Sequence, residues 1–143
     1  MTANKTVTTD LYLRVQQFYA RQMHAQDSGR HDDYADTFTE DGVFAFGPGL
    51  EPAVGRETIR ALLTDNSVVG GDDPVQVRHW FNQLVLEPRD DGAFDSRFYA
   101  LVVNTRPGST PEFVTSAFVH DVLLIDDDGI LMRSRTLSPD HLA

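Results

Sequence analysis

The chain has 143 residues, of which 22 are Asp or Glu and 12 are Lys or Arg, so its formal net charge at neutral pH is −10. A surface this acidic repels phosphate backbones and anionic lipids, so neither nucleic acid nor a membrane is an expected partner. The chain has no cysteine, which excludes disulfides, thiolate metal sites and cysteine nucleophiles.

The length corresponds to a single domain, residues 1–143, that can bury a core and hold a pocket. No apolar run approaches the length of a membrane span, and the first nine residues lack the apolar core of a secretory signal. We therefore expect a cytoplasmic protein. Residues 1–8 are polar and are expected to be disordered.

Apolar residues at three-to-four spacing predict three helices in the first half of the chain. The first helix is capped by Thr9 or Asp10 and stops at the Asp-Ser-Gly sequence of residues 27–29. The second is short and covers about residues 33–38, and the third covers residues 56–63.

The second half of the chain is mostly extended. Residues 75–87 are rich in β-branched and aromatic side chains and predict a long strand. Further strands are predicted at 93–106, 112–125 and 130–137, with turn residues between them, so the four should form an antiparallel meander. A short strand is predicted earlier, at 43–46.

Strict alternation along the long strand places His79, Phe81 and Val85 on one face and Trp80 on the other. Both faces are largely apolar, so this strand should be covered on both sides. Covering the outer side requires another copy of the chain, and a homodimer is therefore expected. Helices gathered first and an antiparallel sheet gathered last predict an α+β fold.

Four segments, taken in order, resemble the nuclear transport factor 2-like superfamily and, within it, the SnoaL-like group. Residues 29–44 look like its second helix and the following turn, and 55–60 like the start of its third helix. Arg78-His79 resembles the pair that opens its long strand, and 129–135 its final hairpin. The resemblance implies a cone-shaped α+β barrel, with three N-terminal helices packed on a curved, mostly antiparallel sheet.

The resemblance also suggests site residues. Scytalone dehydratase and a similar bile-acid dehydratase have a Tyr and an Asp after the first helix and a histidine near the start of the long strand. Asp27 and His79 occupy the matching positions here, whereas Gln26 stands where the tyrosine would be. Tyr19 or Tyr34 could replace the missing phenol.

Such a pair suits proton transfer in an apolar cavity, with His79 as the general base and Asp27 as its orienting partner or as an acid. This chemistry requires no cofactor. No metal site is expected either, because the histidines lack the short spacings of a first shell. The abundant aromatic residues favour a hydrophobic carbonyl substrate, such as a polyketide intermediate. The pocket is predicted to include Tyr19, Met23, Tyr34, Phe38, Phe44, Trp80, Phe98, Phe118, His120 and Arg135.

Each assignment has a structural alternative. His79 could be a core residue bonded to a backbone carbonyl, and Asp27 could simply end a helix. Arg135 could form an ion pair with Asp121 on a neighbouring strand. The chain could also be a non-catalytic ligand-binding or assembly subunit, resembling the small subunit of ring-hydroxylating dioxygenases. An enzyme should have His79 and a carboxylate within hydrogen-bond reach in an open cavity, whereas a structural subunit should fill that cavity with its own side chains.

Overall fold

The three α-helices predicted from the sequence are present in the computed structural model, which describes residues 6–143, although the second lies earlier than predicted. The cap of the first helix lies earlier than predicted, because the Thr8 hydroxyl accepts a hydrogen bond from the backbone N–H of Leu11 at 3.1 Å. Disorder was expected for residues 1–8, of which residues 1–5 fall outside the described part of the chain. In the described part, Val7 packs against the core and Thr8 caps the first helix. The helices are α1 (Thr9–Asp27), α2 (His31–Ala35) and α3 (Arg56–Asp65).

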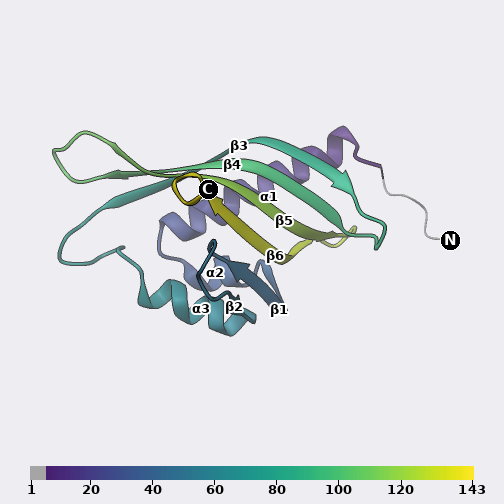
Figure 1. Cartoon of the computed structure of the whole chain (residues 1–143), viewed down its shortest axis with the longest axis horizontal. Coiled ribbons are helices and arrows are strands. Elements are labelled where there is room, and N and C mark those ends of the chain that lie inside the picture. The colour runs from purple at the N-terminus through teal and green to yellow at the C-terminus, as the bar shows by residue number, and fades with distance from the viewer. Residues whose placement is uncertain (1–5) are drawn as a thin grey trace.

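The strands within the described residues form one six-stranded sheet in the order β2-β1-β6-β5-β4-β3. Neighbouring strands are antiparallel except for β1 and β6, which are parallel. The sheet is curved, and its edge strands β2 and β3 stay apart, so the predicted cone is open (Figure 1). The strands are β1 (Phe38–Ala45), β2 (Ala53–Val54), β3 (Gln76–Pro88), β4 (Phe94–Thr105), β5 (Glu112–Ile125) and β6 (Ile130–Pro139), and a 3₁₀ turn (Asp140–Leu142) follows.

The predicted α+β class and the four-stranded meander from β3 to β6 are confirmed. The tight turns between its strands have the chemistry that the sequence indicates. At the β5–β6 turn, the Asp126 carboxylate accepts hydrogen bonds from the backbone N–H groups of Asp128 and Gly129. These local interactions explain why the strand ends could be predicted from turn residues.

The segment after α2 differs from the prediction. Phe38 was expected in the second helix, but it begins β1 and pairs with Met132 of β6. The register with β6 is irregular between Phe38 and Val43, which is where a turn was expected. Pairing with a strand almost a hundred residues away therefore overrides the local helix and turn preferences of this segment.

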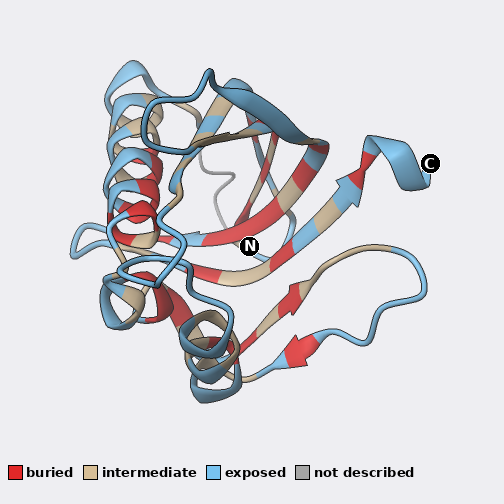
Figure 2. Cartoon of the chain, turned by 90° about the vertical axis from the view of Figure 1, so that its left-hand side faces the viewer, coloured by how far each residue is buried: buried red, intermediate tan, exposed pale blue. Residues whose placement is uncertain are grey.

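The core lies between the helices and the sheet face that they cover (Figure 2). Helix α1 contributes Val15, Tyr19 and Met23 to it. The opposite sheet face is open in the single chain, where Trp80 is 65% exposed and Phe113 is 78% exposed. The expectation that β3 is covered on both sides is therefore wrong for one chain by itself.

A bulge in β3 reverses the predicted alternation of its side chains. Gln83 has a φ of 61°, in the left-handed region, and the register with β4 shifts between Asn82 and Val85. As a result Leu86 enters the core, while Val85 is exposed. The assignment of Val85 to the same face as His79 is therefore wrong. The extra residue of the bulge moves each later side chain of β3 to the opposite face of the sheet.

Candidate active site

Asp27 and His79 form a close pair at the junction of α1 and β3. The Oδ1 atom of Asp27 lies 2.6 Å from Nδ1 of His79, and its Oδ2 atom accepts a hydrogen bond from the backbone N–H of His79 at 3.1 Å. One carboxylate thus holds both the ring and the backbone of the histidine. This is the pairing expected from the sequence for an enzyme.

The fold explains why these two residues meet. Helix α1 ends at Asp27 because Gly29 takes up the left-handed conformation, with a φ of 77°, and the N–H of Arg30 bonds back to the carbonyl of Ala25. β3 is an edge strand, so an outward-pointing N–H on it has no neighbouring strand. The Asp27 carboxylate satisfies that N–H at His79.

The hydrogen bond to Asp27 determines which atom His79 offers to a ligand. A carboxylate only accepts, so the neutral ring carries its proton on Nδ1 and keeps a lone pair on Nε2. Within residues 6–143, Nε2 has no hydrogen-bond partner. His79 therefore has the orientation of a general base whose conjugate acid Asp27 would stabilise.

The pair lies in the wall of a cavity of about 1000 Å³. The cavity is bounded by α3, the loops on either side of it, the end of α1 and the start of β3. Ten of its lining residues are apolar and nine are polar or charged. The apolar contributors include Phe46, Leu50, Ala53, Leu62, Leu63 and Val69. A cavity of this size and lining suits a hydrophobic molecule.

Most of the other predicted pocket residues on the inner sheet face belong to the core. Met23, Phe38, Phe44 and Phe98 are buried and pack in one hydrophobic cluster, and none of them lines the cavity of about 1000 Å³. Met23 and Tyr19 do line a second hollow beside His79, of about 390 Å³, between α1 and β3. Phe44 stacks on Phe46 with ring centroids 4.3 Å apart. The aromatic residues thus build the wall behind the cavity, while Phe46 forms its surface.

Trp80, Phe118 and His120 require a correction. They project from the outer face of the sheet, where Trp80 and Phe118 line a separate hollow of about 910 Å³. His120 lies beside them in β5 and pairs with Asp95, with 2.7 Å between Nε2 and Oδ1. Phe118 and His120 line neither hollow beside His79. Trp80 also borders the smaller hollow of about 390 Å³ between α1 and β3, which His79 lines as well.

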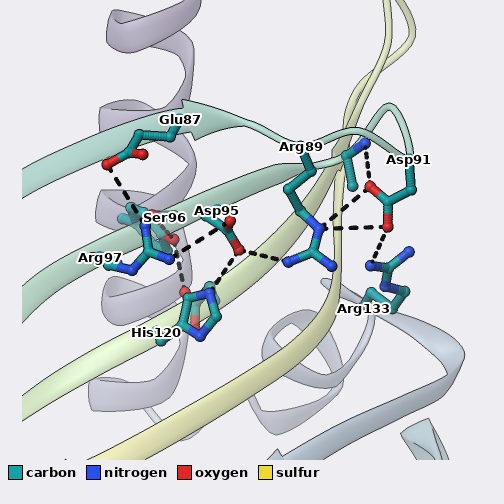
Figure 3. Close-up of polar contacts among 11 residues, drawn as sticks. Glu87, Arg89, Asp91, Asp95, Ser96, Arg97, His120 and Arg133 are labelled. Carbon is teal, nitrogen blue, oxygen red and sulfur yellow. Dashed lines mark hydrogen bonds and ion pairs between the residues drawn. The ribbon is translucent and has the colours of Figure 1, made fainter. Parts of the chain in front are cut away.

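The outer-face histidine belongs to a chain of ion pairs (Figure 3). Arg89 and Arg97 both contact Asp95, and Arg89 also contacts Asp91. Burial alone would raise the pKa of Asp95, but hydrogen bonds from His120 and Arg89 lower it below its ordinary value. These charged groups pair with one another and not with groups in a cavity. We therefore assign the network a structural role at the ends of the strands.

Arg135, predicted in the pocket, lies instead at the centre of a buried polar network. It forms two hydrogen bonds of 2.9 Å with the carboxylate of Asp121, its register partner on β5. It also donates to the Tyr34 hydroxyl at 3.0 Å and to Gln22 at 2.9 Å. The ion pair between neighbouring strands, considered as an alternative from the sequence, is therefore present.

This network also engages the two tyrosines that could have supplied a catalytic phenol. The Tyr19 hydroxyl donates a hydrogen bond to Asp121 at 2.7 Å. It lies 2.7 Å from the Ser96 hydroxyl, and because its own proton is used for Asp121, Ser96 is the donor in this second bond. Burial raises the pKa of Tyr19 and of Tyr34. Both remain neutral phenols whose hydroxyl groups are already bonded in the core, so neither replaces the missing tyrosine at the His79 cavity.

Sequence reasoning missed several residues of the cavity, above all His31. This histidine begins α2 and lines the same cavity as His79. Its position four residues after Asp27, just past the end of α1, is the signal that could have identified it. Thr58 on α3 and Asn66 also line the cavity and were not predicted.

The described residues include no group of three or more His, Asp or Glu side chains placed to bind a metal ion. Within the same part of the chain, no helix is both long and apolar enough to span a membrane.

The helices, the open curved sheet and the cavity beside an Asp–His pair define an α+β protein of the nuclear transport factor 2-like class. The model of the SnoaL-like domain matches residues 7–136, and the chain belongs to this family. No curated protein matches the chain in sequence.

Solved structures of similar proteins agree with this assignment. ActVI-ORFA from Streptomyces coelicolor is 40% identical, with a TM-score of 0.86 over 93% of this chain and 99% of that one. A protein from Catenulispora acidiphila, in complex with S-DNPA, is 43% identical, with a TM-score of 0.81 over 94% of this chain and 96% of that one.

A third structure shares the fold alone. The β subunit of benzoate 1,2-dioxygenase from Burkholderia mallei is 16% identical, with a TM-score of 0.75 over 96% of this chain and 93% of that one.

Proposed function

We propose that this protein is a cofactor-independent lyase, isomerase or cyclase that acts on a hydrophobic carbonyl compound, such as a polyketide intermediate. The observation that carries the proposal is the 2.6 Å contact between Asp27 and His79 in the wall of an open, partly apolar cavity. Membership of the SnoaL-like family, which includes polyketide cyclases and isomerases, supports the same reading.

The proposed chemistry begins with proton removal from the carbon next to the substrate carbonyl. Nε2 of His79 accepts this proton, and the Asp27 carboxylate stabilises the imidazolium that forms. In a lyase, the enolate then expels a β-hydroxyl group, the carbon–oxygen bond breaks, and the imidazolium gives its proton to the leaving oxygen, which departs as water. In an isomerase, the double bond shifts and the imidazolium returns the proton to another carbon of the conjugated system. Each acid–base step of this kind contributes about a hundredfold to ten-thousandfold in rate.

The alternative is an assembly subunit without activity, as suggested by the fold shared with a dioxygenase β subunit. A subunit of that kind should fill the space beside His79 with its own side chains. The cavity here is instead about 1000 Å³ in volume and is lined by both members of the pair. We therefore favour the enzymatic function.

Binding of S-DNPA, the compound present in the similar Catenulispora structure, tests the proposal. We expect it to bind to the wild-type protein and to lie in crystals beside Nε2 of His79. Leu62→Trp, which places an indole in the cavity wall, should weaken binding at least tenfold, whereas Leu13→Trp on the exposed side of α1 should leave it unchanged. Absence of binding, or density only on the outer sheet face, would contradict the proposal.

We also propose that the outer sheet face binds a second copy of the chain. Trp80, Tyr99, Leu101, Phe113 and Phe118 are exposed on this face and surround one hollow, so they form a contiguous apolar patch of the kind that marks an interaction surface. Part of the charge at its edge is paired within the chain, as Figure 3 shows for Asp95 with Arg89 and Arg97. These side chains do not need a partner from a second copy.

Sedimentation equilibrium at micromolar concentration should give the mass of a dimer for the wild-type protein. Phe113→Lys, at a side chain that is 78% exposed, should give a monomer, because it would bury an ammonium group in the interface. Leu13→Lys is the control, since Leu13 is 62% exposed on α1, away from this face. A wild-type monomer, or a dimer that survives Phe113→Lys, would contradict the proposal.

A further inference from the structure

A second histidine shares the cavity with His79. His31, the first residue of α2, lines the cavity together with Asp27 and His79. Unlike His79, it has no carboxylate at its Nδ1 atom. That atom is buried and has no hydrogen-bond partner within the described residues. The two rings therefore line the same cavity, but Nδ1 is bonded to a carboxylate in His79 and has no partner in His31.

The buried Nδ1 atom limits the forms that the His31 ring can take. A proton on Nδ1 would create a buried N–H without an acceptor, and buried N–H groups without partners are rarer in proteins than unpaired acceptors. An imidazolium would have the same unpaired N–H and a charge in addition. The favoured form is the neutral ring with its proton on Nε2.

The carboxylates near His31 do not change this conclusion by direct contact. Glu51 and Asp65 lie in the cavity wall but form no hydrogen bond with it among residues 6–143. On its own helix, Asp32 is paired with Arg60 and Asp33 with Arg30. Asp27 is occupied by His79.

We infer that His31 is the hydrogen-bond donor that binds the substrate's carbonyl oxygen while His79 removes the proton. This inference rests on the proposed function. His79 offers a lone pair on Nε2 and His31 offers an N–H, so the lining of one cavity includes the base and the electrophile that enolate formation requires. A neutral imidazole donor fills the role that neither Tyr19 nor Tyr34 can fill, since both hydroxyls are bonded in the core.

The first test does not depend on any ligand. In ¹⁵N-histidine-labelled protein at pH 8, long-range ¹H–¹⁵N spectra distinguish the two neutral forms of each ring. We expect the proton on Nε2 in His31 and on Nδ1 in His79, with the signals assigned from the His31→Gln and His79→Gln variants. The exposed His24 serves as the reference for a ring without constraints. A proton on Nδ1 of His31, or an imidazolium at this pH, would overturn the inference and leave the proposed function intact.

The second test uses 1-tetralone, an aromatic ketone with a ¹³C-labelled carbonyl, as the probe. Its carbonyl stretching frequency should fall on binding to the wild-type protein and to His31→Gln, whose side-chain amide keeps a donor. In His31→Phe the shift should disappear and the dissociation constant should rise about tenfold. An equal shift in His31→Phe would overturn the inference alone, whereas failure of the wild-type protein to bind the ketone would overturn the proposed function with it.

Discussion

Replacing Arg135 by methionine is expected to lower the free energy of unfolding by about 3–5 kcal/mol, the usual cost of breaking a buried ion pair from one side. Arg135 is 2% exposed, and its guanidinium pairs with a carboxylate that is fully buried. Burial alone would lower the pKa of Arg135, but the negative charge of Asp121 raises it overall, so the cation is firmly held. Without the Arg135 guanidinium, the Asp121 carboxylate keeps only the Tyr19 hydroxyl as a side-chain hydrogen-bond donor.

Urea unfolding monitored by circular dichroism measures this effect. Arg133→Met is the matched control, because Arg133 lies two residues away on β6 and pairs with Asp91 at the surface. It should change the free energy of unfolding by less than about 1 kcal/mol. The double variant Arg135→Met with Asp121→Leu removes both charges and should recover at least half of the loss. If Arg135→Met is no worse than Arg133→Met, the buried network does not stabilise the fold.

Local patterns predict the elements of this fold well, because helix periodicity and turn residues act over a few positions. The ends of the meander strands, and Asp27 at the end of α1, follow from such signals. The sequence does not predict which sheet face the side chains after Gln83 point to. A single residue in the left-handed conformation exchanges the two faces, and no sequence pattern marks this bulge. Val85 was misplaced for this reason.

The candidate site was only partly predictable for a related reason. The Asp27–His79 pair came from a family resemblance, while the residues that share its cavity depend on how the loops around α3 pack against β3. Trp80 and His120 were assigned to the pocket by residue type, although their strand positions place them on the outer face. Residue chemistry indicates what a site could do, but strand parity decides which side chains can act together.

His79→Gln is expected to slow proton abstraction by about a hundredfold to ten-thousandfold, because an amide cannot accept the proton. Exchange of the hydrogens next to the carbonyl of 1-tetralone for deuterium, followed by NMR, measures this step directly. His120→Gln is the matched control, since His120 also pairs with an aspartate at 2.7 Å but lies on the outer face. Equal loss in both variants would show that a general effect on folding, and not the base, had been removed.

Asp27→Asn separates the two roles of the carboxylate, as an anchor for β3 and as the partner of the ring. The amide oxygen can still accept from the backbone N–H of His79, but its NH₂ group then faces Nδ1 and favours the ring form with the proton on Nε2. Exchange should therefore fall about a hundredfold or more, while urea unfolding changes little. If stability falls in parallel with exchange, Asp27 acts as an anchor. If exchange alone falls, the carboxylate orients the base, because only the ring's proton has moved.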